Sequence, residues 1–273
     1  MKKILFATDG KHFSEGAFEF VRHLNSLSPI TLTGIFLPQV DLSRYLNYAT
    51  AAKTGIFYPE LEEEESKELE SSIDHFKSLC TSNHITSESH NCCEEQAIPA
   101  VEAESRFADA LVIGSETFYK NDGNGTPNAY LKEVLHHAEC PVLLIPEKFK
   151  FPDSIIFCYD GSASAVFAIR QFAYLFPELT DRPLSILYLG DKEGELVPNQ
   201  KAVMQLMSRC FKNMKVLSLG EDMKHAMNWL RDLENPIVVA GSYGRSSLSR
   251  MFSKSFITTL IREHTVPIFI AHK

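Results

Sequence analysis

Long hydrophobic runs, a basic excess and a cysteine framework are all missing from this chain of 273 residues. No run approaches the ~18 apolar residues of a membrane-spanning helix, and the apolar part of the N-terminal MKKILFATDG is too short for a signal peptide. Lys and Arg number 27 against 35 Asp and Glu, and the formal net charge of −8 argues against nucleic-acid binding. We therefore expect a cytoplasmic protein with neither a membrane nor a nucleic-acid partner.

Recognisable catalytic and metal-binding spacings are missing as well. The six cysteines show no framework spacing, so we expect reduced thiols rather than disulfides. The histidines near Cys80, Cys92 and Cys93 do not follow the spacings of zinc sites, and surface histidines are the simpler interpretation. No Ser/His/Asp or Cys/His arrangement stands at a familiar spacing, so no catalytic residue is nominated and an efficient enzyme is not expected.

What the chain does contain is an internal duplication, with 44% hydrophobic residues, enough for real cores. KILFATDG at 3–10 aligns with SIIFCYDG at 154–161, and the helices that follow share their apolar spacing. ADALVIGS at 108–115 aligns with NPIVVAGS at 235–242, and ECPVLLI at 139–145 with TVPIFIA at 265–271. Matching pieces in the same order indicate two tandem copies, which we place at 1–148 and 149–273.

Each copy alternates short, continuously apolar runs with longer segments of helical period, which predicts a parallel sheet covered by helices on both faces. The first copy is predicted to contain strands 3–8, 30–37, 85–90, 109–114 and 142–145, with helices 14–27, 61–80, 97–107 and 127–138. The second is predicted to contain strands 154–159, 184–189, 215–219, 236–241 and 267–271, with helices 163–176, 198–211, 222–233 and 249–263. Two prolines make the linker at 146–153 extended.

These motifs resemble the universal stress protein family in its tandem two-domain form. The residues that carry the resemblance are ATDG and CYDGS after the first strands, LVIGS and VVAGSYGR after the fourth, and the closing AECPVLLIP and HTVPIFIAH. The resemblance implies an α/β fold of the adenine-nucleotide alpha-hydrolase-like type, with a five-stranded parallel sheet of order 3-2-1-4-5 in each copy. It also implies ATP or another adenine nucleotide at the carboxyl ends of strands 1 and 4, and ligands of open α/β sheets bind at that switch point.

The second copy carries the more complete nucleotide motif. Binding members of the family show Gly-x-x-Gly, nine residues, and then Gly followed by Ser or Thr. Here the pattern reads Gly241-Ser242-Tyr243-Gly244, nine residues, and then Lys254-Ser255. Glycines let the backbone approach a phosphate. A lysine where glycine is expected either grips the phosphate with its ammonium or occupies the phosphate site itself by pairing with Asp160, and the simplest alternative is an exposed lysine without a ligand. The Asp160-Gly161 pair is expected beside the adenosine part, and no metal is expected beyond nucleotide-associated magnesium.

The first copy departs further from that pattern. Gly114 matches, but Thr117 replaces the second glycine and only seven residues precede Gly125-Thr126. Asp9, Gly114, Gly125 and Thr126 form a weaker candidate site. The leading hypothesis is a regulatory ATP binder of the stress response that acts through its second copy. The alternatives are a nucleotide-free interaction module, with function in surfaces such as the insertion at 45–60, and a slow ATPase.

The closing strands 142–145 and 268–270 would both be apolar sheet edges, which proteins usually pair or cover. The resemblance suggests that these edges mediate the pairing of family domains. In a tandem chain the two copies are then expected to pair with each other, and the association of two chains into a homodimer is left open.

Overall fold

Apolar strands and amphipathic helices alternate along the whole chain, as the sequence predicts. The computed structural model describes residues 1–37, 63–91, 97–120, 127–190, 192–220, 223–241 and 252–271. The first half contains β1 (Lys2–Thr8), α1 (Glu15–Leu27), β2 (Ile30–Phe36), α3 (Glu63–Ser82), β3 (Thr86–Asn91), α4 (Ala97–Ser105), β4 (Ala110–Gly114), α5 (Ala129–His137) and β5 (Val142–Ile145). The second contains β6 (Ser154–Cys158), α6 (Ala163–Leu175), the 3-10 turn η1 (Pro177–Leu179), β7 (Leu184–Leu189), α7 (Gln200–Met207), β8 (Met214–Leu219), α8 (Met223–Arg231), β9 (Pro236–Ala240), α9 (Phe252–Glu263) and β10 (Ile268–Ile270).

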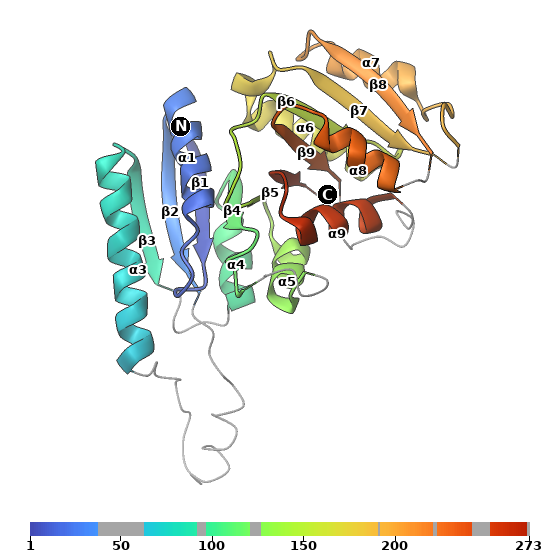
Figure 1. The fold of residues 1–273 in the computed structure, drawn as a ribbon. Coiled ribbons are helices and arrows are strands. Elements are labelled where there is room, and N and C mark those ends of the chain that lie inside the picture. Colours follow the sequence, from blue (N-terminus) through green and yellow to red (C-terminus); the bar gives the residue numbers. More distant parts are fainter. Residues whose placement is uncertain are drawn as a thin grey trace.

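The strands join into one ten-stranded sheet of order β3-β2-β1-β4-β5-β10-β9-β6-β7-β8. Each half taken alone has the predicted order 3-2-1-4-5, and its neighbouring strands run parallel. The two halves meet where β5 and β10 pair antiparallel, with Leu143 opposite Phe269. The predicted pairing of the two closing strands within one chain is confirmed, and Figure 1 shows the two halves on either side of this junction.

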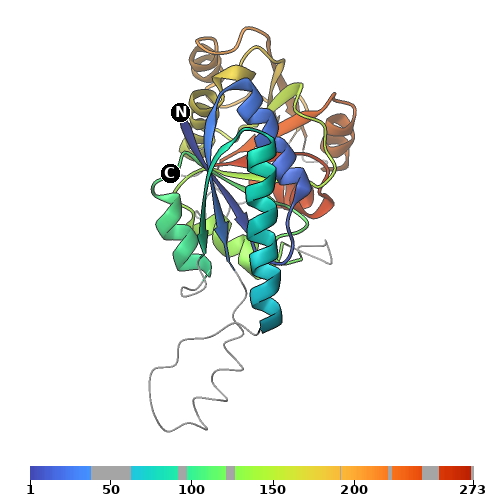
Figure 2. The ribbon, with the colours of Figure 1, turned by 90° about the vertical axis from the view of Figure 1, so that its left-hand side faces the viewer.

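Helices cover both faces of the sheet because successive side chains of each buried strand point to opposite faces. Ile4 and Phe6 of β1 belong to one hydrophobic cluster with α1, α3, α6 and α7, whereas Leu5 and Ala7 belong to a second cluster with α4, α5, α8 and α9. Both clusters extend through both halves of the molecule. Figure 2, turned from the first view, shows α1 and α3 lying over the same side of the strands.

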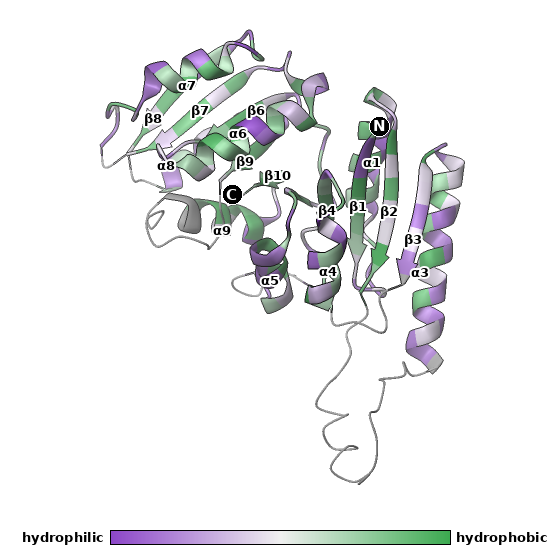
Figure 3. Ribbon diagram, turned by 180° about the vertical axis from the view of Figure 1, so that it is seen from behind, coloured by the Kyte–Doolittle hydropathy of each residue, from purple (hydrophilic) through white to green (hydrophobic). Residues whose placement is uncertain are grey.

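The outer edges of the sheet are more polar than its middle. β3 reads TSESHN and is one of the hydrophilic strands in Figure 3, and β8 at the opposite edge carries Lys215. Charged residues on an edge strand discourage pairing with another chain. The two apolar strands that would otherwise be edges, β5 and β10, are fully buried against each other.

One helix is markedly shorter than predicted. The sequence predicts a helix over 198–211, but α7 runs only from Gln200 to Met207. Pro198 precedes it, and Asn199 has a φ of +50°, a left-handed conformation that cannot continue a helix. The insertion at 45–60 and the Cys92-Cys93 pair lie outside the described residues. Among the helices that are described, none combines the length and the apolar composition needed to cross a bilayer.

Candidate functional site

The order of strands creates two switch points, one between β1 and β4 and one between β6 and β9, where successive crossovers leave in opposite directions. The fold brings Asp9 and Gly114 to the first switch point, and Asp160, Gly161 and Gly241 to the second. The other predicted site residues lie outside the described part of the chain, wholly for Gly125, Thr126, Ser242 and Gly244, and in their side chains for Lys254 and Ser255.

In the first half, Asp9 is saturated by hydrogen bonds from its own chain. The side chain is only 4% exposed. Its Oδ1 accepts the main-chain N–H groups of Lys11 at 3.0 Å and His12 at 2.7 Å. Its Oδ2 lies 2.7 Å from Nδ1 of His12 and accepts the main-chain N–H of Tyr119 at 2.9 Å. A carboxylate with both oxygens occupied in this way ties the β1–α1 loop to the segment after β4 and has little capacity for a ligand.

Tyr119 closes the first switch point from the side of β4. Its hydroxyl donates to the carbonyl oxygen of Leu37, the residue after β2, at 2.5 Å, and its ring stacks on Tyr130 with centroids 4.1 Å apart. Asn128 donates from Nδ2 to the carbonyl oxygen of Tyr119 at 3.2 Å and caps α5 by accepting from Leu131 N. Burial, with the charges of Tyr130 and Asp9, raises the pKa of Tyr119, so its hydroxyl remains a donor. An aromatic ring of the chain itself thus lies between the ends of β1, β2 and β4.

A carboxylate of the chain also occupies the N-terminus of α1. Glu147, two residues after β5, accepts hydrogen bonds from the hydroxyl of Ser14 and, at 3.1 Å, from the main-chain N–H of Gly16. The positive end of a helix dipole favours an anion at this position. Glu116 in turn accepts the main-chain N–H of Glu147 at 2.5 Å, and burial followed by the neighbouring Glu147 charge raises its pKa. The first half therefore supplies its own anion at a helix end that could otherwise face a ligand.

Asp160, at the corresponding position of the second half, is much less engaged. It is partly buried, and among the described residues its carboxylate accepts one hydrogen bond, from Ser162 N to Oδ1 at 2.9 Å. Counted from the Asp-Gly pairs, the residue corresponding to His12 is Ala163, which has no side-chain donor. Within the described part of the molecule, Oδ2 of Asp160 is thus available to a ligand donor.

The glycines at the two switch points serve the chain's own packing. Gly10 and Gly161 have φ of +83° and +78°, which turns the chain from the strand into the helix. A Cβ on Gly241 would stand 2.6 Å from Ala165 N and 2.7 Å from the carbonyl carbon of Ser164, and one on Gly114 would meet Ser14 and Thr117. Gly241 therefore admits the first turn of α6 beside β9, and its φ is not among the positive ones.

The cysteine thiols near these residues stay protonated, and thus poor nucleophiles, because they are buried. Cys158 lies two residues before Asp160, but burial, helped by the Asp160 charge, raises the pKa of its thiol, so it stays protonated. Burial raises the pKa of Cys140 to about 12 in the same way. Within the described ranges, no group of three or more His, Cys, Asp or Glu side chains is arranged to hold a metal ion.

Sequence reasoning missed the three side chains that fill the first switch point, His12, Tyr119 and Glu147. The replacement of the second motif glycine by Thr117 signalled that this loop differs, but nothing local identified its occupants. Tyr119 is 110 positions from Asp9, and Glu147 is 133 positions from Ser14, so both contacts depend on the finished topology.

The chain was compared with known proteins by sequence and by fold. No family model matches the chain. A curated protein, universal stress protein Slr1230 from Synechocystis, is 20% identical over 293 aligned residues, covering 98% of this chain and 99% of the relative. The crystal structure of a universal stress protein from Archaeoglobus fulgidus has a TM-score of 0.68 and 17% identity, covering 100% of this chain and 96% of the other. A functionally unknown protein, PA1789 from Pseudomonas aeruginosa, has a TM-score of 0.55 and 11% identity, covering 100% and 92%. The two solved structures show a shared fold, and the curated match spans both halves.

Proposed function

We propose that the chain, which is similar over its whole length to universal stress proteins, is a tandem two-domain member of that family. It would be a cytoplasmic regulatory protein that binds an adenine nucleotide, with ATP the leading candidate, in its second half. The site would be formed by Asp160, Gly161, Gly241, Ser242, Gly244, Lys254 and Ser255. Binding would serve a stress response, and the first half, which we assign to residues 1–148, would act as a packing partner.

The observation that carries this proposal is the difference between Asp9 and Asp160. At the same position of two copies of one fold, the first carboxylate is saturated by four contacts from its own chain, and the second has one among the described residues. Unused hydrogen-bonding capacity at a switch point favours a ligand there. The adenosine hydroxyl or amino groups are donors that match a carboxylate oxygen.

The sequence of the second half also keeps residue types that bind phosphates. Gly244 and Ser255 keep the backbone access and the hydroxyl of the motif, and Lys254 contributes a positive charge. By the alignment of the two closing strands, the residue corresponding to Glu147 is Lys273, so the carboxylate that caps α1 in the first half has a cationic counterpart in the second. A nucleotide bound there would bring its magnesium with it, and no residue of the chain is assigned a step in phosphoryl transfer.

Calorimetric titration of ATP into the purified protein tests the proposal, after acid release and ion-exchange chromatography of any co-purified nucleotide. We expect binding by the wild type, weakened about tenfold by Asp160→Asn, because a charge-assisted hydrogen bond contributes roughly 1.5–3 kcal/mol. Asp181→Asn is the matched control, since Asp181 is an exposed residue of the same half that pairs with Lys212. Gly244→Val should abolish binding, whereas Gly241 is unsuitable as a probe because its substitution would displace α6.

Lys254→Gly separates the two roles of the lysine. Weaker binding in this variant means that the ammonium holds the phosphates. A silent wild type with binding restored by Lys254→Gly means that the lysine closes the site. If neither protein binds ATP, ADP or AMP, the nucleotide proposal is wrong and the interaction-module hypothesis takes its place.

A further inference from the structure

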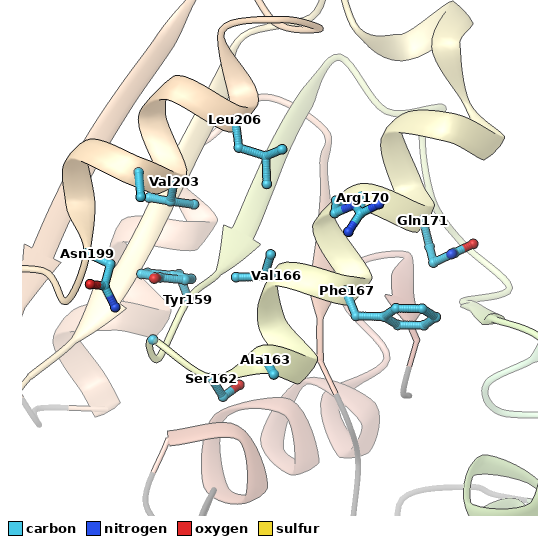
Figure 4. A pocket seen from close by; sticks show the side chains of 12 residues that line it. Tyr159, Ser162, Ala163, Val166, Phe167, Arg170, Gln171, Asn199, Val203 and Leu206 are labelled. Carbon is cyan, nitrogen blue, oxygen red and sulfur yellow. The ribbon is translucent and has the colours of Figure 1, made fainter.

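An open groove of about 750 Å³ lies between α6 and α7, on the face of the sheet covered by the first helices of each half. Its apolar wall consists mainly of Tyr159, Val166, Val203 and Leu206. Its polar side chains are those of Ser162, Arg170, Gln171 and Asn199. Figure 4 shows Val166 of α6 and Leu206 of α7 pointing toward one another, with Tyr159 and Val203 beside them. The volume is that of a small-molecule pocket, and such pockets combine apolar walls with a few polar groups.

In the first half, side chains at the start of α1 and in the loop before it contact α3. Phe13 packs on Phe6 with ring centroids 5.2 Å apart and on the edge of His75 at 4.8 Å. His75 of α3 lies 2.8 Å from the carboxylate of Glu15, and Lys11 forms an ion pair with Glu68 at 3.1 Å. An aromatic ring and two polar contacts therefore join the start of α1 and the loop before it to α3.

None of these bridging residues has an equivalent in the second half. Counted from the Asp-Gly pairs, Lys11, Phe13 and Glu15 correspond to Ser162, Ser164 and Val166. The opposing helix is also shorter, because α7 has 8 residues where α3 has 20. The contacts that Lys11, Phe13 and Glu15 make in the first half are thus not available to the corresponding residues of the second half, where the groove lies.

Arg170 gives the groove a charge preference. Its guanidinium lies 6.0 Å from the ring centroid of Tyr174, and it forms no ion pair with any residue in the described ranges. An exposed cation beside an apolar wall favours a ligand that places an anionic group next to the guanidinium and an apolar body against the wall. We propose that the α6–α7 groove is a binding site for a small aromatic anion, such as an aryl carboxylate or sulfonate.

This site shares Gly161 with the proposed nucleotide site and differs from it in its other residues and in its chemistry. The groove is lined by Tyr159, Gly161 and Ser162, which flank Asp160, but the Asp160 side chain is not part of its wall. A ligand in the groove would therefore contact the α6 end of the same loop without occupying the switch point. Either proposal can fail while the other holds, because each has its own ligand and its own variants.

Two fluorescent probes with almost the same rings and different charge test the groove. 8-Anilinonaphthalene-1-sulfonate carries the anion, and N-phenyl-1-naphthylamine is its neutral counterpart. We expect saturable binding of the sulfonate at one site per chain, measured by fluorescence titration and calorimetry. Arg170→Gln should weaken the sulfonate about fivefold or more and leave the neutral probe within about twofold, because the lost hydrogen bonds are charge-assisted.

A second experiment fills the groove with a larger side chain. Ala202 of α7 and Ala163 of α6 line the groove at exposed positions, so Ala202→Phe and Ala163→Phe should each weaken both probes about tenfold while the far-ultraviolet circular dichroism stays unchanged. Gln205→Phe is the control, since it adds the same ring at an exposed position of α7 that does not line the groove. Unchanged binding in both filled variants, equal losses of both probes in Arg170→Gln, or no binding by the wild type would overturn the proposal.

Discussion

Asp9 and Asp160 show how one residue type acquires two roles within a duplicated chain. Asp9 is buried and accepts main-chain N–H groups from Lys11, His12 and Tyr119, so it holds two loops together. Asp160 accepts one such bond among the described residues and stays partly exposed. The first is therefore expected to contribute mainly to stability and the second to ligand binding.

Replacing each aspartate by alanine should separate these roles. Asp9→Ala leaves buried main-chain donors without an acceptor, and each costs roughly 1–3 kcal/mol, so we expect the free energy of unfolding to fall by about 3 kcal/mol. Asp160→Ala loses one partly exposed hydrogen bond and should cost about 1 kcal/mol or less. Urea denaturation monitored by circular dichroism measures both values. Equal losses in the two variants would contradict the assigned division of roles.

The aspartates themselves were predictable from the sequence, and their different surroundings were not. An apolar run ending in Asp-Gly identifies both residues at the carboxyl end of a first strand. The partner that closes the first site, Tyr119, follows a different strand, and its φ of +49° is an unusual backbone conformation that propensity does not anticipate. Prediction at this scale fails wherever the occupant of a site comes from a distant part of the chain.

At the level of elements, each switch point has a helix that packs closely against the end of a strand, α1 against β4 and α6 against β9. The first turn of α6 lies so near β9 that a Cβ on Gly241 would stand 2.6 Å from Ala165 N. Gly114 has the same relation to Ser14, the N-cap of α1. The first glycine of the nucleotide motif thus has a structural function in both halves, whichever half binds a ligand.

Gly241→Ala should accordingly be destabilising even without nucleotide. Because the obstructing atoms belong to the helix backbone, α6 must move, and we expect a loss of about 2–3 kcal/mol in the free energy of unfolding. Gly194→Ala is the comparison, since Gly194 has a φ of +75° and nothing within 4 Å of an added Cβ. That variant should cost only about 1 kcal/mol, from backbone strain. A smaller loss for Gly241→Ala than for Gly194→Ala, in urea titrations of both proteins, would rule out the close contact.

The helices and strands were largely predictable, because each has a distinct hydrophobic period and a matching segment in the other copy. The exception is α7, whose predicted span of 198–211 overran the helix at both ends, across Pro198 and Asn199 at its start and into the turn at 208–210 after Met207. The groove beside α7 could not be predicted either. It is lined by residues of both α6 and α7, and it becomes visible only when the two helices are placed together.

At the scale of the whole molecule, the two halves share one sheet and its cores. The pairing of β5 with β10 makes the sheet continuous, and both hydrophobic clusters include residues from each half. Lys2, at the start of the chain, forms an ion pair with Glu178 at 2.7 Å and lies 5.7 Å from the ring centroid of Phe176. Contacts of this kind predict that the halves unfold together, although they arose as copies of one unit.

Phe269 lies at this junction and offers the sharpest test of cooperative unfolding. Its ring is fully buried, opposite Leu143 across the strand pair and 5.3 Å from the ring of Phe172. Phe269→Ala should cost about 3 kcal/mol and lower the hydrogen-exchange protection of the most stable amides about 100-fold. If the molecule unfolds as one unit, the amides of β1 in the first half and β9 in the second lose protection equally. Tyr174→Ala, at an exposed position of α6, should change neither set, and a loss confined to the second half would mean that the two halves unfold independently.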